Sequence, residues 1–311
     1  MLPALGILVV FGAVIAGYLM EHGKLMVLVQ PAELVIIGGA AIGTLLVANP
    51  LPVVINLFKG VLGLLCNCRC TKAFYLDSLK MRYQLFQVAR KGGMAKLEEE
   101  IEAPEKSPVF SQYPAISKDH HLLHFICDTV RTSVSGVVLS HDLDAMLEAD
   151  IDVHHHGLST PVKALETVGD ALPGLGIVAA VLGVVNTMGA LGGPPAEIGE
   201  KVASALVGTF LGILLCYGLA APLAAHMSKR GDAENQYYQV LRAGLMAFAK
   251  GMAPIIAVEF ARRAIPHALR PNFNDMEKAC KGAGAPPPVA EADGTAAGAP
   301  EQVAEPVPEP A

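Results

Sequence analysis

Charged residues are scarce in this chain and are missing from long stretches of it. Asp, Glu, Lys and Arg make up 17% of the 311 residues. Leu2–Met20, Leu34–Leu57 and Ala171–Ala196 contain none, and neither does Val202–Ser228 apart from His226. A helix needs about 20 apolar residues to cross a bilayer. The four runs therefore predict an all-α, polytopic membrane protein with four transmembrane helices in two hairpins.

Motifs for nucleotide binding and hydrolysis are also missing. The sequence contains no G-x-x-x-x-G-K-[ST] and no G-x-S-x-G, and no G-x-G-x-x-G opens a helix after a strand. With a net charge of −6 and no dense basic stripe, the chain offers no nucleic-acid surface. We therefore expect no enzymatic activity, no cofactor and no nucleic-acid partner, and we favour a role in transport or mechanics.

The predicted spans have no Asp, Glu, Lys or Arg at mid-membrane depth. Proton and ion carriers normally keep an ionisable group there. If this chain moves protons, a partner must therefore supply the carboxylate. Glu33 lies at the outer end of the second span, where interface solvation or capping of the helix N-terminus accounts for it.

The uneven distribution of Lys and Arg orients the spans. Of 23 such residues, 12 lie between residues 51 and 172, 9 follow residue 225, and only Lys24 and Lys201 lie elsewhere. The positive-inside rule then places the long middle segment and the C-terminal region in the cytoplasm. The expected divisions are transmembrane helices 1 and 2 (1–50), a cytoplasmic helical domain (51–169), transmembrane helices 3 and 4 (170–225), cytoplasmic C-terminal helices (226–280) and a disordered Pro/Ala-rich tail (281–311).

The middle segment has the apolar spacing of helices. Apolar residues recur with a helical period over 73–97, 122–138 and 143–153. After Pro222 the fourth helix is expected to continue through residues 234–247, with polar residues on one face. We therefore expect a helical cytoplasmic part.

Two groups of potential metal ligands stand out, a C-x-C-x-C and three consecutive histidines (Cys66, Cys68, Cys70; His154, His155, His156). The cysteines lack a nearby fourth ligand at zinc spacing, and a reducing cytoplasm leaves ordinary thiols. His120 and His124 share a helix face but lack the glutamate of a zinc-protease helix. We favour the interpretation without metal for all of them.

Prolines and glycines punctuate the last two spans. Pro173 opens the third span and Pro222 closes the fourth, and each removes an amide donor. Each therefore marks a helix end or bends a helix where something moves. Gly208 and Gly212 would let a second helix approach closely, within one subunit or between subunits. The residues alone leave both choices open.

Four segments together resemble the MotA family of flagellar motor stator subunits, in the wider group that includes ExbB and TolQ. They are QPAELVIIGGA (30–40), VGDALPGLGIVAAVLGVVNTMGALGGPP (168–195), ALVGTFLGILLCYGLAAPLA (205–224) and PIIAVEFARR (254–263). The resemblance implies a bacterial inner-membrane homopentamer around a dimer of MotB, a subunit that anchors to peptidoglycan and carries the proton-binding aspartate. It also implies that the cytoplasmic part pushes the rotor protein FliG.

The resemblance assigns roles to residues along the presumed ion path. Pro173 and Pro222 match the family's two functional prolines, which would couple protonation to movement. Ala180 stands where sodium-type relatives have threonine, and losing this oxygen ligand favours protons. Thr209 and Tyr217, about two turns apart, could hold water near the partner's carboxylate.

Arg90 and Glu98 match the family's charged rotor-contact positions. In a regular helix, eight residues leave them only about 80° apart, although Gly92 and Gly93 intervene. The leading prediction is thus a proton-driven torque generator. An ExbB-like or TolQ-like energiser of an outer-membrane process is the alternative, and a membrane scaffold or an unfamiliar metalloenzyme using the histidines is a third.

Overall fold

The computed structural model describes residues 2–64, 70–189, 192 and 194–282. Within these ranges every regular element is a helix, which confirms the predicted all-α fold. The elements are α1 (Leu2–Met20), α2 (Leu25–Leu28), α3 (Pro31–Ala48), α4 (Leu51–Gly63), α5 (Lys72–Glu102), α6 (Pro108–Ser111), α7 (Pro114–Ser117), α8 (His120–Val134), α9 (Ser140–Met188), α10 (Pro195–Leu215), η1 (Cys216–Ala220), α11 (Ala221–Ala249), α12 (Pro254–Ala264) and α13 (Phe273–Gly282).

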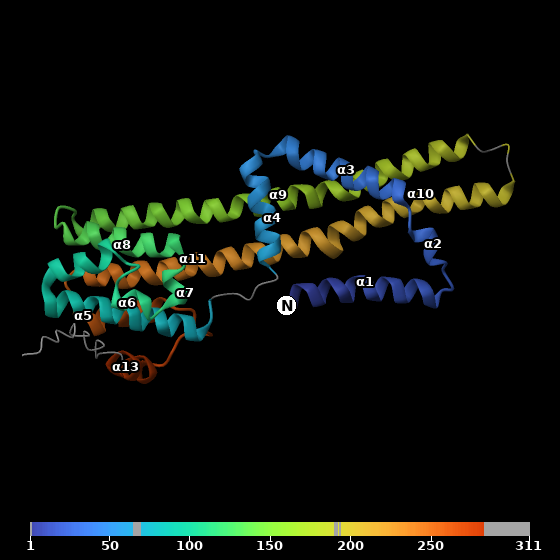
Figure 1. Cartoon of the computed structure of the whole chain (residues 1–311). Coiled ribbons are helices and arrows are strands. Elements are labelled where there is room, and N and C mark those ends of the chain that lie inside the picture. The colour runs from blue at the N-terminus through green and yellow to red at the C-terminus, as the bar shows by residue number, and fades with distance from the viewer. Residues whose placement is uncertain (1, 65–69, 190–191, 193, 283–311) are drawn as a thin grey trace, which may run out of the picture.

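A hairpin of two long helical stretches runs the length of the molecule (Figure 1). One arm is α9, with 49 residues, and the other is the continuous run of α10, η1 and α11. At 1.5 Å per residue, α9 is about 75 Å long, more than twice the ~30 Å hydrocarbon core of a bilayer. The predicted helix over 143–153 and the predicted third span are therefore one helix. No loop separates the predicted membrane part from the predicted cytoplasmic part along either arm.

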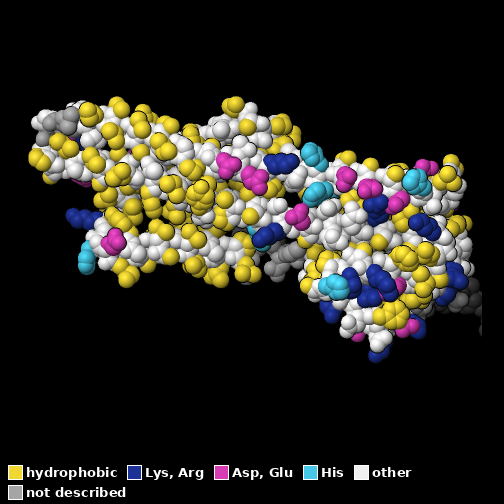
Figure 2. Space-filling model, turned by 180° about the vertical axis from the view of Figure 1, so that it is seen from behind, with side chains coloured by type: hydrophobic (Ala, Val, Ile, Leu, Met, Phe, Trp, Pro, Cys, Tyr) yellow, Lys and Arg dark blue, Asp and Glu magenta, His cyan; other side chains and the backbone are white. Residues whose placement is uncertain are grey.

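Four helical stretches are long and apolar enough to cross a membrane, as predicted (2–20, 25–48, 140–188 and 195–249). Figure 2 shows apolar side chains covering the part of the molecule around these spans, while charged side chains gather toward the opposite end. α3 packs along α9. None of the 19 residues of α1 is buried, which leaves its surface available to lipid or to partner chains.

The short helix α4 lies across the hairpin between these two parts (Figure 1). Val54 and Leu57 belong to an apolar cluster with Val162 of α9 and Met227 of α11. The Arg230 guanidinium of α11 donates a hydrogen bond to the carbonyl oxygen of Gly63. α4 thereby ties the end of the second span to both arms of the hairpin.

The predicted cytoplasmic part has its own core, in which α5, α8, α12 and α13 surround the ends of α9 and α11. The rings of Phe86 and Phe248 stack with their centroids 4.3 Å apart. Arg82 is completely buried, which lowers its pKa, and its Nη1 donates to the carbonyl oxygen of Val240 at 3.0 Å. This hydrogen bond fixes α5 against α11.

Some local predictions differ from the structure. α5 contains one non-helical residue, Gly93, whose φ of 81° favours glycine. α8 ends at Val134, four residues before the predicted end, and Gly136 follows with a φ of 65°. Lys281 and Gly282 belong to α13 rather than to the predicted tail, whose remaining residues lie outside the described ranges.

Candidate ion-path and coupling site

Small residues bring α9 and α10 into backbone contact within the membrane part. A Cβ atom on Gly212 would lie 2.6 Å from the carbonyl oxygen of Leu172 and 2.8 Å from Gly176 Cα. A Cβ atom on Gly176 would lie 2.8 Å from the carbonyl oxygen of Gly208. The Gly208/Gly212 pair therefore packs within one subunit, which settles the choice that the sequence left open.

This contact places two of the predicted path residues beside each other. A Cβ atom on Gly208, the residue before Thr209, would lie 3.2 Å from the backbone nitrogen of Ala180. Both Ala180 and Thr209 are half-buried in the single chain. α9 and α10 thus present Ala180 and Thr209 at one level of the hairpin.

The two predicted functional prolines lie on opposite arms of the hairpin. Pro173 is inside α9 rather than at its start, and Pro222 is at the beginning of α11. Gly169 is opposite Ala220, because a Cβ atom on it would lie 3.3 Å from Ala220 Cβ. Neither proline ends its arm, so the interpretation that they merely mark helix ends does not fit this structure.

A π-helical turn, η1, ends at Ala220, two residues before Pro222. Proline has no N–H to donate to the carbonyl four residues back, and its ring collides with that carbonyl. The N–H of Ala221 instead donates to Cys216 O, five residues back. Such turns occur frequently at functional sites. This turn was not predicted from the sequence, where Pro222 after a regular apolar helix is the only signal for it.

Tyr217 lies inside η1 and is 69% exposed in the single chain. The two-turn spacing between Thr209 and Tyr217 assumed a regular α-helix. A π-helical turn is wider than an α-helical turn. The angle between the Thr209 and Tyr217 side chains therefore differs from the angle that a regular α-helix would give. Tyr217 is nevertheless available to an adjoining chain.

The two predicted rotor-contact residues lie on either side of the break in α5, in the predicted cytoplasmic part. Arg90 and Glu98 are both exposed. Since Gly93 interrupts the helix between them, the expected angle of about 80° does not apply. The structure therefore presents the two charges on separate helical segments that meet at Gly93.

Glu33 is buried, contrary to the sequence-based interpretation. Only 6% of it is exposed, so interface solvation does not account for it. The N-cap of α3 forms no side-chain hydrogen bond, and within the described residues Glu33 Oε2 has no hydrogen-bond partner. Its burial depends on how α3 packs on α9 and α10, and one acidic residue in an apolar helix was the only sign of it in the sequence.

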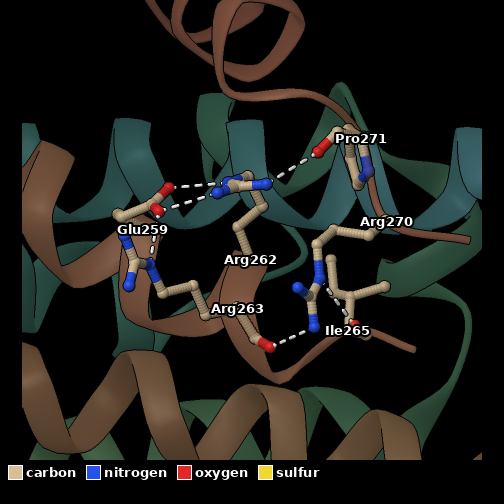
Figure 3. Close-up of polar contacts among 6 residues, drawn as sticks. All are labelled: Glu259, Arg262, Arg263, Ile265, Arg270 and Pro271. Carbon is tan, nitrogen blue, oxygen red and sulfur yellow. Dashed lines mark hydrogen bonds and ion pairs between the residues drawn. The ribbon is translucent and has the colours of Figure 1, made fainter. Parts of the chain in front are cut away.

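An ion-pair cluster anchors α12 within the PIIAVEFARR segment (Figure 3). Arg262 contacts Glu259 with two nitrogens, Nε at 2.6 Å and Nη2 at 2.8 Å, and Arg263 Nε approaches it at 2.8 Å. The remaining Arg262 nitrogen, Nη1, donates to Pro271 O at 3.0 Å. The hydrogen bond from Arg262 holds the pKa of Glu259 below its ordinary value of 4.5. The cluster fixes the chain between α12 and α13.

We expect Glu259→Gln to destabilise the predicted cytoplasmic part by about 2 kcal/mol at neutral pH, since it removes the charge from a half-buried hydrogen-bonded pair. A carboxyl whose pKa is lowered on folding contributes stability above its unfolded value, and this contribution is lost as the pH falls through the folded value. The difference in thermal midpoint between the two proteins should therefore shrink below about pH 4.5. A constant difference across this range would contradict the assignment. Glu277→Gln is the control, because its partner Lys281 is exposed.

The possible metal ligands that the structure describes do not converge. No group of three His, Cys, Asp or Glu residues in the described part of the chain has a geometry that could hold a metal ion. His154 Nε2 lies 3.7 Å from Glu234, and its ring lies against Tyr238. Cys70 donates to the carbonyl oxygen of Ala233 at 3.7 Å, while Cys66 and Cys68 lie outside the described residues.

The sequence of this chain matches one group of related protein families. Residues 4–93 match the family described as motility protein A N-terminal, and residues 118–240 match the MotA/TolQ/ExbB proton channel family. Motility protein A of Escherichia coli is 42% identical over 89% of this chain and 94% of its own length. Chemotaxis protein LafT of Vibrio parahaemolyticus is 37% identical over 88% of this chain and 96% of its own length.

Two solved structures share the fold. A structure of MotAB from C. jejuni matches with a TM-score of 0.70 and 15% identity, covering 85% of this chain and 95% of that chain. The flagellar MotAB stator complex from Bacillus subtilis matches with a TM-score of 0.68 and 21% identity, covering 85% of this chain and 96% of that chain.

Proposed function

The chain belongs to the motility protein A family, within the MotA/TolQ/ExbB proton channel family, and from this premise we propose that it is a stator subunit of the bacterial flagellar motor. It is a multi-pass membrane protein, and it forms a proton-conducting complex with a MotB partner. The extent of its likeness to motility protein A is the observation that carries this conclusion. The complex converts proton flow into torque on the rotor.

The proposal extends to the assembly and to the orientation in the membrane. Five copies surround two MotB chains, with the large loop and the C-terminus in the cytoplasm, where most of the basic residues lie. The unburied surface of α1 and the exposed Tyr217 are available for contacts with other chains. The partner supplies the carboxyl at mid-membrane depth that this chain lacks.

In this proposal the hairpin links the ion path to the rotor. Ala180 and Thr209 line the path, and Pro173, Pro222 and η1 are the positions where the two arms can change shape. Both arms continue without a loop into the cytoplasmic part, so a change at the prolines moves the domain that carries Arg90 and Glu98. The lack of a hydroxyl at Ala180 supports protons rather than sodium as the driving ion.

Arg90 and Glu98 would contact FliG through complementary charges. We expect Arg90→Glu to reduce swimming speed severalfold, because like charges then oppose the rotor surface during each engagement. The measurement is swimming speed, with the number of assembled stators counted at the motor. Lys118→Glu, the same charge reversal at another exposed basic residue, is the control. Normal speed in the Arg90 variant would contradict the rotor contact.

A deletion strain separates this function from the ExbB-like or TolQ-like alternative. The stator function predicts cells that assemble flagella but do not rotate them, with rotation restored by a plasmid copy of this chain. Normal swimming with a defect in an outer-membrane process would instead support the alternative.

A further inference from the structure

Glu33 is the only charged residue of α3, and its carboxyl group lies where α3, α9 and α10 meet. A Cβ atom on Gly208 of α10 would collide with Glu33 Oε2. A Cβ atom on Gly183 of α9 would lie 3.5 Å from Glu33 Oε1. Gly208 thus leaves the space that the carboxyl occupies, and Gly183 lies beside the other carboxyl oxygen in ordinary van der Waals range. The chain itself buries this group, so burial does not depend on a partner.

The neighbouring elements supply no cation to Glu33. Along α10 the charged residue nearest to Glu33 is Lys201. It lies one turn outward from Ala205, which packs against Gly183. The ammonium group of Lys201 pairs with Glu197 at 3.1 Å. α9 carries no charged residue between Asp170 and its end, and Lys24 lies before α2. A buried carboxylate without a cation or a hydrogen-bond donor is costly, so burial favours the protonated, uncharged carboxyl.

The carboxyl lies beside the residues assigned to the ion path. Gly208 directly precedes Thr209, and the Gly208 position approaches the backbone of Ala180. Gly183 is five residues from the end of α9 at Met188, which places the group about 8 Å inside that end. Under the proposed orientation this end faces outward. Glu33 is therefore on the outer approach to the level of Ala180 and Thr209.

We propose that Glu33 is a proton-binding site of this chain, which takes up a proton on the outer side and releases it to water toward the partner's carboxyl. The carboxylate accepts a proton from a hydronium ion and later returns it to a water molecule, so only O–H bonds form and break. The proposal rests on the stator function for its place in the path. Its chemistry rests on the buried carboxyl alone.

The test compares Glu33→Gln, which keeps the shape but cannot exchange a proton, with Glu33→Asp, which keeps the acid. Single-motor rotation is measured at constant proton-motive force while the external pH is varied, with assembled stators counted in parallel. We expect the Gln variant to assemble but to rotate about tenfold more slowly, a factor that corresponds to about 1.4 kcal/mol, and to lose part of the pH dependence. The Asp variant should retain the wild-type pH profile. Glu197→Gln, at an exposed outer position, is the control and should rotate normally.

A second measurement does not depend on rotation or on assembly at the motor. Infrared spectra of the purified complex, recorded while the pH is lowered, should contain a protonated carboxyl band that is absent from the Gln variant. Wild-type rotation and pH profile in the Gln variant, or no such band in the wild-type complex, would overturn the proposal. If the wild-type chain powers no motor, the stator function fails, and the infrared spectrum still decides whether Glu33 holds a proton.

Discussion

Replacing Pro173 by alanine is expected to stop rotation, with a loss on the order of tenfold or more in speed, while the stator still assembles. Alanine restores an N–H that can donate to the carbonyl of Gly169 and removes the ring that collides with it. α9 then becomes a regular helix at Pro173, close to the backbone contact between Gly176 of α9 and Gly212 of α10. A stiffer arm transmits less of any change at the ion path to the cytoplasmic part.

The measurement is the rotation of single motors together with the number of stators at each motor. Pro161→Ala is a matched control, because Pro161 is also inside α9 but lies twelve residues closer to its cytoplasmic end. We expect that variant to rotate nearly as the wild type does. Normal swimming of the Pro173 variant would show that this proline has no part in coupling.

The second large effect is expected at Gly212, where even alanine should disrupt the membrane part. Its Cβ atom would lie 2.6 Å from Leu172 O and 2.8 Å from Gly176 Cα, and both are backbone atoms that cannot rotate away. Moving α10 away from α9 should cost about 1–3 kcal/mol. This outweighs the gain of about 0.5–1 kcal/mol that alanine brings to a helix over glycine.

Thermal unfolding of the purified protein and its amount in the membrane measure this effect. Gly199→Ala in the same helix is the control, because nothing lies within 4 Å of a Cβ atom there. We expect a lower thermal midpoint and loss of motility for Gly212→Ala, and an unchanged or slightly higher midpoint for Gly199→Ala. Equal midpoints for the two variants would mean that α9 and α10 do not pack as closely as described.

The spans could be predicted from the sequence because the bilayer imposes them directly. An uncharged run of about 20 residues has few alternatives to a membrane helix, and each of the four runs overlaps a helical stretch apolar enough to cross. The cytoplasmic helices were also visible from their apolar spacing. That α9 continues unbroken from Ser140 was not visible, because Pro161 and Pro173 both suggest interruptions.

The features that the sequence did not reveal depend on contacts between helices or on unusual backbone geometry. Glu33 looked like a solvated residue at a helix end, and only the register of α3 against Gly183 and Gly208 buries it. The relation between Arg90 and Glu98 depends on the positive φ of Gly93, which a helical pattern does not report. η1 is a local response to Pro222 that regular helical spacing does not predict.

Single-motor rotation at controlled ion gradients tests the central claim most directly. The motor is powered only by this chain and its MotB partner, in cells without other stators. Its speed is recorded while an uncoupler lowers the proton-motive force and, separately, while external sodium is varied at constant proton-motive force. Proton-driven torque predicts a speed that falls in proportion to the proton-motive force and does not respond to sodium. A speed that follows sodium and persists after the proton gradient has collapsed would contradict it.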